Sequence, residues 1–249
     1  IAALTALDFL GLGMPPGSPS LGELLLDELL LHPGRAIVLP AGNQNAGNTE
    51  VVGAGKTRIV PHLAIPGSAT EPRTERLAFG YTTRASKADT VEIWFRAAGT
   101  PTAAVTVEPG GPPIEPLSGN EGRPMRVLSI VDGAARMVLL AELGRGAERD
   151  LWRLRLSLLP VRGAMPVETL RFEITNVVGE LHAWCDWNNA TQRDWKEPAL
   201  GRQDDRTTLT TPATAHRVIV VGECLEDAAG FRPAEPSGRG PTLDGRFRP

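Results

Sequence analysis

The segment Gly53–Thr57 has the residue types that end a phosphate-binding loop, with glycines followed by Lys56 and Thr57. In such a loop, backbone N–H groups and the lysine surround the phosphates, and a helix follows directly. The first glycine of that pattern is replaced here by Glu50, and a carboxylate at this position repels phosphate. The residues after Thr57 have an extended pattern instead of a helical one. The sequence therefore favours a flexible boundary over a nucleotide site.

An aromatic and amide-rich stretch, Trp184–Asn189, is followed by Trp195. Flat aromatic side chains beside amide groups suit the faces and hydroxyls of a sugar, so one interpretation is a glycan-binding platform. The other is that Trp184 fills a core and that residues 186–195 form a polar loop, because large aromatic side chains usually contribute buried area first. The residues favour the second interpretation and leave the first open.

Two pairs of neighbouring acids, Asp204–Asp205 and Glu226–Asp227, supply oxygen ligands of the kind that calcium takes. Paired acids on a surface are more often simply solvated, so no cofactor is predicted and a structural calcium stays an alternative. The chain has two cysteines, Cys185 and Cys224, which are too few for a disulfide framework. Each is interpreted as a small buried apolar residue instead.

Composition limits the classes of partner. The 249 residues are 41% hydrophobic and 22% charged, which is ordinary for a globular protein. The formal net charge of −3 gives no electrostatic case for binding nucleic acid. No apolar run reaches the length of about eighteen residues that indicates a membrane span. Because the sequence lacks an initiator methionine and stops within a motif at Pro249, we interpret it as a fragment of a longer protein; residues 1–7 have no basic leader of the kind that a signal peptide carries.

The pattern of residues 1–56 is typical of an α/β unit. Ser20 and Glu23 have the spacing of a capping box, in which each side chain satisfies a free N–H of the first helical turn. The leucine-rich run Leu21–Leu31 has acids between its leucines and predicts an amphipathic helix, which Pro33 ends.

Two short apolar runs predict strands of a parallel sheet. Ala36–Leu39 and Arg217–Val221 are nearly continuous Val, Ile and Leu, as in strands that are buried on both faces. A helix that leads into such a strand suits a doubly wound sheet, in which ligands bind beyond the carboxyl ends of the strands. Asn43 would emerge at such an end. The tail after Gly230 is rich in Pro, Gly and Arg and predicts loop.

From residue 57 to residue 206 the helical periodicity disappears, and short alternating runs are separated by Pro and Gly clusters. Trp152–Leu158 alternates apolar and polar residues, as a half-buried strand does. Eight or nine strands at a spacing near ten residues predict a β-sandwich. The predicted strands are Arg58–Ile65, Arg76–Tyr81, Thr90–Arg96, Ala103–Glu108, Met125–Val131, Met137–Leu143, Leu151–Leu158, Glu168–Asn176 and Glu180–Trp184.

Three blocks resemble the subtilisin-like serine proteases, or subtilases. Thr211–Gly222 resembles the family's Thr-Pro-Ala block, which leads into a buried Val/Ile strand. Pro236–Pro249 contains Arg-Gly-Pro-Thr followed by Asp-Gly-Arg, and it resembles the family's block ahead of the nucleophile. Ala36–Asn43 resembles the strand that ends in Ala-Ala-Gly-Asn. The order of the blocks agrees with the family, while the gap after Asn43 is much longer, which implies an inserted module.

The resemblance implies roles for the residues at the end of the first strand. Asn43 would donate to the oxyanion of the tetrahedral intermediate, because an asparagine amide is neutral and is always a donor. Leu39, Pro40, Ala41 and Gly42 would form a wall of the pocket for the substrate side chain before the scissile bond.

Departures from the family leave alternatives open. Pro40 replaces a small residue and lacks an N–H, which puts the substrate subsite in doubt. Gly238 stands where the family has Ser. On the residues alone, Gly42-Asn43 is also ordinary turn chemistry after a strand, and Asn45 competes with Asn43 for the role of donor.

The catalytic triad of the family is not recognisable in the chain. The family's motifs around Asp, His and Ser are absent, and the four histidines lack the expected neighbours: His32, His62, His182 and His216. The resemblance therefore implies that Asp and His lie upstream of Ile1 and that Ser lies beyond Pro249. The fragment alone is predicted to be inactive.

These observations predict an α/β parallel-sheet subtilase core in residues 1–56 and 207–249, interrupted by an inserted β-sandwich in residues 57–206. The arrangement is similar to that of subtilases related to clostridial germination proteases, which carry a jelly roll at this place. The implied activity is hydrolysis of peptide bonds in a protein substrate, with the insert contacting a propeptide or a second subunit. The alternative is a non-catalytic scaffold that binds protein or glycan. An exported, extracytoplasmic location is mildly favoured.

Overall fold

The computed structural model describes 21–41, 48–52, 55–59, 62–81, 89–108, 114–121, 124–132, 135–145, 150–162, 169–185, 193–196, 213–227, 230–234 and 237–240. The chain divides into two compact units, residues 1–62 with 204–249 and residues 63–203. These boundaries differ from the predicted junctions of 1–56, 57–206 and 207–249, and the interpretation of the units as a protease core and an insert stays a prediction.

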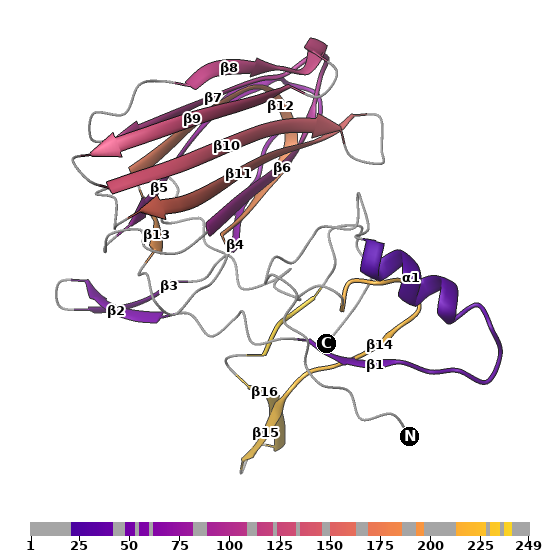
Figure 1. Cartoon of the computed structure of the whole chain (residues 1–249). Coiled ribbons are helices and arrows are strands. Elements are labelled where there is room, and N and C mark those ends of the chain that lie inside the picture. The colour runs from indigo at the N-terminus through magenta and orange to yellow at the C-terminus, as the bar shows by residue number, and fades with distance from the viewer. Residues whose placement is uncertain are drawn as a thin grey trace. The chain divides into compact units, whose positions relative to one another are not determined.

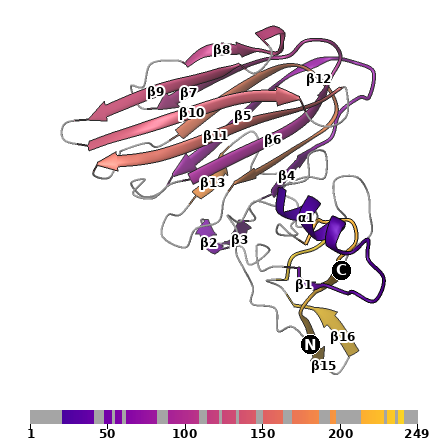
Figure 2. The ribbon, with the colours of Figure 1, turned by 45° about the vertical axis from the view of Figure 1, so that its right-hand side comes forward.

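The unit of residues 63–203 is built on one ten-stranded sheet that folds over itself into two layers (Figures 1 and 2). Its strands run in the order β13-β5-β12-β6-β11-β10-β9, with β4 and β7 also pairing β12 and with β8 pairing β7. The pairings whose register is known are antiparallel. The strands are β4 (His62–Ile65), β5 (Arg73–Tyr81), β6 (Asp89–Ala97), β7 (Thr102–Glu108), β8 (Ile114–Ser118), β9 (Met125–Asp132), β10 (Ala135–Arg145), β11 (Leu151–Arg162), β12 (Thr169–Cys185) and β13 (Arg193–Lys196), and a 3-10 turn, η1 (Gly119–Glu121), follows β8.

The long strand β12 belongs to both layers. Its first part pairs β5 and β7, and its second part pairs β6. Between the two parts the register shifts, and Asn176 (φ 61°) and Gly179 (φ 64°) adopt left-handed backbone. The Asn176 side chain donates to the carbonyl of Thr100 at 2.7 Å, which fixes the bend. The alternating pattern predicts two strands here, Glu168–Asn176 and Glu180–Trp184, whereas the structure has one strand with a bend at Asn176 and Gly179.

Alternation of apolar and polar residues explains how the two layers enclose a core. On β10 and β11 every second residue is a fully buried apolar side chain, from Met137 to Leu143 and from Trp152 to Leu158. In a strand successive side chains point to opposite faces, so these residues all face the interior. One hydrophobic cluster collects residues from β4 to β8 and from β10 to β12, and Leu128 and Ile130 of β9 pack against it.

The other unit contains the only α-helix of the described residues, α1 (Leu21–Leu29). Strands β1 (Val38–Pro40) and β14 (Ile219–Val221) pair in parallel. Two antiparallel hairpins complete the described part of the unit, β2 (Asn48–Val52) with β3 (Gly55–Ile59) and β15 (Cys224–Asp227) with β16 (Gly230–Pro233).

The predicted fold class is wrong. The described residues are mostly strand in antiparallel pairings, and parallel pairing is confined within them to the three residues each of β1 and β14. A parallel sheet needs a crossover connection, usually helical, between each pair of its strands, and α1 is the one helix that the described part supplies. In addition, Val38, Ile219 and Val221 are exposed, so these two apolar runs are not buried on both faces as predicted.

Two smaller predictions in this unit also fail. Residues Gly230–Pro233, predicted as loop, form β16, with Gly230 at φ 107° at the hairpin turn. Cys224, predicted as buried, is an exposed free thiol. No helix in the part of the chain described here is long and apolar enough to cross a membrane.

Candidate functional site

The end of β1 carries the segment that sequence analysis assigns to a substrate pocket. Pro40 lies opposite Val221 in the parallel register, and the next N–H, that of Ala41, donates to the carbonyl of Val221 at 2.8 Å. Leu39 and Ala41 are buried, whereas Pro40 is exposed. The missing N–H of Pro40 therefore does not interrupt the pairing at this end of the two strands. Gly42 and Asn43 lie outside the described residues, and so does Asn45.

Two carboxylates of α1 hold the loop that precedes β14. Asp27 accepts hydrogen bonds from two successive backbone N–H groups, those of His216 at 3.1 Å and Arg217 at 2.7 Å. Glu23 is buried and accepts the hydroxyl hydrogen of Thr214. Because the loop leads directly into Ile219, these bonds fix where β14 begins. Sequence analysis recognises Glu23 only as half of a capping box and does not assign a role to Asp27.

A small core lies behind this loop. Leu39, Ala213, Ala215 and Val218 are buried together, and Leu26 and Leu30 of α1 pack against them. The helix therefore contributes both apolar area and carboxylate acceptors to the position of β1 and β14.

Ser237, in the block that resembles the family's Arg-Gly-Pro-Thr segment, joins the end of β16 to the residue before β15. Its buried hydroxyl accepts the N–H of Glu223 at 3.1 Å, and its own N–H donates to the carbonyl of Ala234 at 3.1 Å. Ala234 in turn donates to the carbonyl of Glu223 at 2.9 Å. The serine hydroxyl thus has a structural role in this turn.

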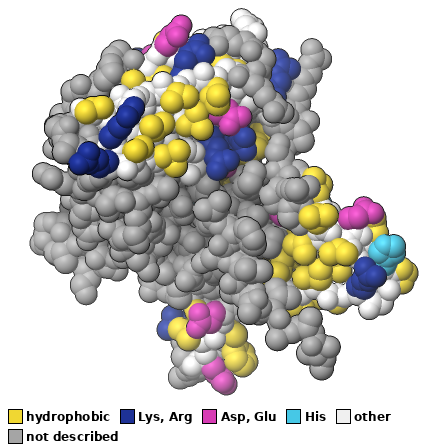
Figure 3. Space-filling model, viewed as in Figure 1, with side chains coloured by type: hydrophobic (Ala, Val, Ile, Leu, Met, Phe, Trp, Pro, Cys, Tyr) yellow, Lys and Arg dark blue, Asp and Glu magenta, His cyan; other side chains and the backbone are white. Residues whose placement is uncertain are grey.

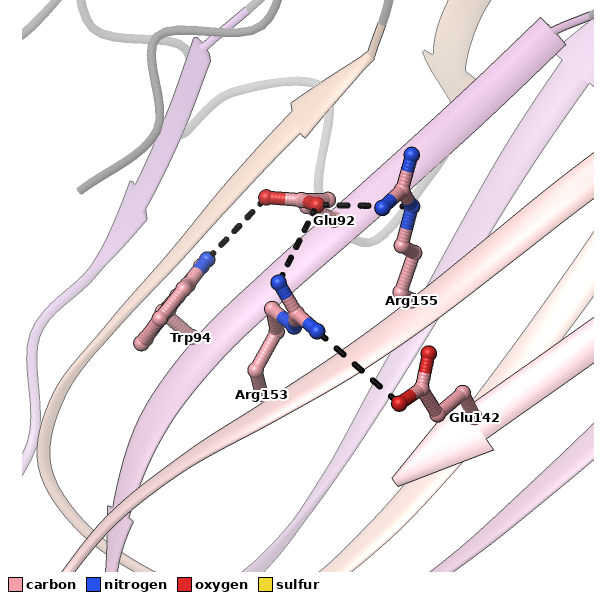
Figure 4. Close-up of polar contacts among 5 residues, drawn as sticks. All are labelled: Glu92, Trp94, Glu142, Arg153 and Arg155. Carbon is pink, nitrogen blue, oxygen red and sulfur yellow. Dashed lines mark hydrogen bonds and ion pairs between the residues drawn. The ribbon is translucent and has the colours of Figure 1, made fainter. Parts of the chain in front are cut away.

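A cluster of charged side chains around one buried carboxylate lies on three neighbouring strands of the ten-stranded sheet (Figure 4). Glu92 of β6 is only 1% exposed, and its Oε1 lies 3.6 Å from Nε of Arg155 and 3.9 Å from Nη1 of Arg153. Its Oε2 accepts a hydrogen bond from the indole N–H of Trp94 at 3.3 Å. Nη2 of Arg153 lies 4.0 Å from Oε1 of Glu142 on β10. Two carboxylates thus balance two guanidinium groups.

The chemistry of this cluster favours a role in holding strands together over proton transfer. The guanidinium groups of Arg153 and Arg155 are permanently charged, so their ion pairs with Glu92 link β6 to β11, and Glu142 extends the link to β10. Sequence analysis finds Arg153 and Arg155 only as the polar positions of an alternating strand. Their partner Glu92 is not recognisable without the order of the strands in the sheet.

Trp184 is buried, but the prediction that it fills the core of the sandwich is wrong, because it is not part of the main hydrophobic cluster. It lies on the opposite face of the sheet from the main core, because it is opposite Glu92 in the register of β12 and β6, and His182 is opposite Trp94. The rings of His182 and Trp184 stack at 5.6 Å between centroids. Trp187 and the side chain of Trp195 lie outside the described residues, so the glycan platform stays untested.

The segment that resembles a phosphate-binding loop belongs to a β-hairpin. Glu50 lies opposite Thr57 and Val51 opposite Lys56 in the antiparallel pairing of β2 and β3. A phosphate loop requires a helix after the lysine, and here the chain continues as strand to Ile59. The extended backbone that the sequence predicts after Thr57 is therefore confirmed as far as Ile59, and nucleotide binding stays untested.

Metal ligands do not come together in the part of the chain for which the structure gives positions. No group of three or more His, Cys, Asp and Glu residues is found there that is able to hold an ion. Glu226 and Asp227 lie at the end of β15, and Asp204 and Asp205 are outside the described residues. Calcium binding by the two acid pairs stays untested.

Two surface ion pairs in the ten-stranded unit shift pKa values. A hydrogen bond from Arg96 lowers the pKa of Asp150 below its ordinary value, and the two side chains are 2.6 Å apart. Arg171 donates a hydrogen bond to Glu108, with 2.8 Å between Nε and Oε1, and this bond raises the pKa of the Arg171 guanidinium. Both pairs are solvent-exposed, so we interpret them as contributions to stability and not as parts of a reactive centre.

Comparison with known proteins adds two findings, and no protein-family model matches the chain. The fold is similar to that of the CspB protease of Clostridium perfringens, with a TM-score of 0.57 and 18% sequence identity, over 90% of this chain and 41% of that one. The chain thus spans about two fifths of that protein, and at this identity the likeness shows the fold alone.

The second finding is a short match to a curated protein. The peptidoglycan transport system permease protein YejE of Agrobacterium fabrum is 76% identical over 25 residues, which are 10% of this chain and 7% of the permease. A match over so small a share of either protein does not assign the chain to a family.

Proposed function

We propose that the chain is part of a subtilisin-like serine endopeptidase, to which it contributes the oxyanion-hole asparagine, Asn43. In this proposal Leu39, Pro40, Ala41 and Gly42 line the substrate pocket, and the Asp, His and Ser of the triad come from parts of the protein beyond these residues. The serine attacks the scissile carbonyl while the histidine takes its proton, and Asn43 donates to the oxygen on which negative charge develops.

The observation that carries the proposal is the fold likeness to a protease, which extends over 90% of the chain and so includes residues of both units. Two further observations support it. The segments that resemble the Ala-Gly-Asn and Thr-Pro-Ala blocks are far apart in sequence, yet their strands β1 and β14 are hydrogen-bonded neighbours. The loop of the second block is also anchored to α1 through Asp27.

The second candidate function is a non-catalytic scaffold that binds a protein or a glycan. It is favoured by the replacement of a small residue by Pro40 in the pocket wall. The two candidates differ in whether the complete protein carries a reactive serine.

The test uses the full-length protein and a fluorophosphonate probe, which forms a covalent bond with an activated serine. In the protease proposal the probe labels the protein, and Asn43→Ala lowers kcat by on the order of 100-fold or more with a smaller change in KM, because the amide acts on the transition state. Asn45→Ala is the matched control and leaves kcat nearly unchanged.

The outcomes separate the parts of the proposal. Absence of labelling and of peptide hydrolysis in the full-length protein refutes the protease and favours the binding scaffold. Labelling with an unaffected Asn43→Ala variant keeps the protease and refutes the assignment of Asn43. A loss of kcat in Asn45→Ala instead assigns the donor role to Asn45.

A further inference from the structure

The outer face of β9, β10 and β11 carries aliphatic side chains that lie next to one another. Because side chains alternate along a strand, the residues between the buried core positions point to this face. Val127 is opposite Leu140 across β9 and β10. Val138 is opposite Leu159 across β10 and β11. The exposed and half-exposed members of this apolar face are Met125, Val127, Val131, Val138, Leu140 and Leu159.

This apolar face is large enough to be seen in the space-filling view. Figure 3 shows hydrophobic side chains gathered over β9, β10 and β11. Val127 and Val131 are each 64% exposed, and Met125 is 55% exposed. Single apolar side chains on a surface are ordinary, but a group of them is typical of an interaction site.

Two arginines stand at one end of the apolar face. Arg136 of β10 is directly opposite Arg162 of β11, and both are exposed. Val131 is opposite Arg136 on the other side, so the apolar face reaches the arginines. Nε of Arg136 donates to Oγ of Ser129 at 3.1 Å, and this bond leaves its Nη groups available. Like charges directly opposite each other destabilise a strand pair, so the arrangement lowers the stability of the sheet.

These two arginines differ from the other cations on the same face. Arg153 and Arg155 are balanced by Glu92, and Arg153 also by Glu142. Among the residues that the structure describes, neither Arg136 nor Arg162 has a carboxylate partner. The described part of this face therefore has uncompensated positive charge at one end only, beside Val131 and Val138.

We propose that this face is a docking surface for a protein segment that presents aliphatic side chains followed by two neighbouring carboxylates. The aliphatic part would cover the valines and leucines, and the carboxylates would lie between or beside Arg136 and Arg162. A guanidinium group is a planar fork that binds a carboxylate through two parallel hydrogen bonds. Binding of two acids also removes the repulsion between the two arginines, which gives the free surface a specific preference for an acidic partner.

Other occupants fit these side chains less well. The net charge of −3 gives no case for nucleic acid. A membrane interface favours tryptophan and tyrosine, whereas the members of the apolar face are all aliphatic. The inference does not depend on the proposed protease activity, because it uses only side chains of β9, β10 and β11.

Selection from a peptide library tests the chemistry of the partner. Random peptides of about twelve residues, displayed on phage, are selected on the whole chain and counter-selected on the Arg136→Gln/Arg162→Gln variant. The peptides that remain are expected to carry two neighbouring acids beside alternating aliphatic residues. A synthetic copy is expected to bind the double variant at least about tenfold more weakly than wild type, because two charge-assisted contacts are lost. Arg171→Gln, an exposed arginine of β12 that already pairs with Glu108, is the matched control and keeps the affinity.

A second variant separates binding from a structural role. Arg162→Glu replaces the like-charge pair with an opposite-charge pair, so the urea midpoint of unfolding is expected to rise. The affinity for the acidic peptide is expected to fall by at least about tenfold, because the face loses a cation and gains an anion. Exchange of the two acids of the peptide for lysine is expected to restore binding to Arg136→Glu/Arg162→Glu.

The apolar part has its own test. Val127→Thr combined with Val131→Thr keeps the branched shape that suits an exposed strand position, so the urea midpoint should not change. The affinity for the same peptide is expected to fall several-fold, because apolar contact area is lost.

Four results overturn the inference. The first is a selection that enriches no peptide, or only peptides without acids. The second is a peptide that binds the Arg136→Gln/Arg162→Gln variant as tightly as wild type. The third is an Arg162→Glu variant with a lowered urea midpoint, which assigns the arginine a structural role. The fourth is binding to phosphatidylcholine vesicles that contain phosphatidylglycerol, when this binding requires the same two arginines and no acidic peptide competes with it; the face then contacts a membrane.

Discussion

The backbone N–H of Ala41 donates to the carbonyl of Val221, at 2.8 Å, and this bond closes a parallel strand pair formed by two ends of the chain. The pair is only three residues long on each side, so its own hydrogen bonds are few. The position of β1 and β14 therefore depends on interactions made by the residues next to these strands. On the side of β14 that support comes from Asp27, which accepts the N–H groups of His216 and Arg217.

Asp27→Ala is expected to loosen β14. The substitution leaves two backbone N–H groups without their acceptor, and hydrogen bonds to a charged group contribute about 1.5–3 kcal/mol each in favourable cases. Because Asp27 is only partly buried, we expect a loss of about 1–2 kcal/mol in local stability. Hydrogen exchange measured by mass spectrometry on peptides covering residues 36–41 and 213–221 reports this loss directly.

The control for this change is Glu28→Ala on the same helix. Glu28 is exposed, and no hydrogen bond or ion pair of its side chain is found among the described residues. Exchange in both peptides should stay at the wild-type rate. Equal effects of the two substitutions would mean that helix stability, and not the two acceptor bonds, controls β14.

Glu92→Gln is expected to destabilise the ten-stranded unit. The amide keeps the shape of the side chain but removes the countercharge of Arg153 and Arg155. Removing one partner of a buried ion pair costs about 3–5 kcal/mol. Because the two arginines are partly exposed, with 20% and 36% of the side chain accessible, we expect about 2–3 kcal/mol here.

Urea unfolding followed by tryptophan fluorescence measures this change, because all five tryptophans lie between residues 63 and 203. Glu142→Gln is the matched control. Its ion pair with Arg153 is long, at 4.0 Å, and the side chain is 31% exposed, so the expected loss is below about 1 kcal/mol. If the two variants unfold at the same urea concentration, Glu92 is not the anchor of the cluster.

Patterns of period two predicted most strands of the ten-stranded unit but missed β8 and β13 and divided β12 into two, and both the success and the misses have physical reasons. Trp152–Leu158 alternates because one face of β11 covers the core while the other carries Arg153 and Arg155. Such a pattern is a property of a single strand. The order of the strands, and therefore the meeting of Glu92 with the two arginines, depends on pairings between distant segments that no local pattern records.

The short apolar runs misled the prediction for a related reason. Parallel pairing does occur between Val38–Pro40 and Ile219–Val221, which overlap the two predicted runs, but the pattern does not determine how many further strands or helices accompany them. Val38, Ile219 and Val221 are exposed, whereas continuous apolar character predicts burial on both faces. The same difficulty applies to Glu23, since its partner Thr214 is distant in sequence.

Gly119→Ala is expected to destabilise the ten-stranded unit through Trp152. A Cβ at Gly119 would lie 2.5 Å from Cη2 and 2.8 Å from Cζ3 of the indole ring. Trp152 is fully buried in the core, so the ring cannot move aside freely. Overpacking of this kind costs about 1–3 kcal/mol, which urea unfolding by tryptophan fluorescence resolves.

Gly144→Ala on β10 supplies the comparison. A Cβ at Gly144 meets no atom within 4 Å, and its backbone is not left-handed, so the alanine is tolerated or slightly stabilising. Wild-type stability in Gly119→Ala would show that the indole ring adjusts to the added methyl group.

The ion pair of Asp150 with Arg96 predicts that the stability of the ten-stranded unit decreases at acidic pH. The hydrogen bond from Arg96 lowers the pKa of Asp150 in the folded state, so folding favours the ionised carboxylate. The contribution to stability is therefore complete above the unfolded pKa of about 3.9, and it is lost as the pH falls through the lower folded pKa. Both side chains are about half exposed, at 42% and 50%, so the contribution is at most about 1 kcal/mol.

The measurement is the difference in unfolding free energy between wild type and Asp150→Asn, followed from pH 6 to below pH 3 by tryptophan fluorescence. Asparagine cannot ionise, so the difference is expected to be constant above the unfolded pKa and to shrink toward zero below it. High salt should reduce it at pH 6, because exposed charges are screened. A difference that stays constant through the acidic range would mean that the carboxylate contributes through shape or hydrogen bonding alone, without its charge.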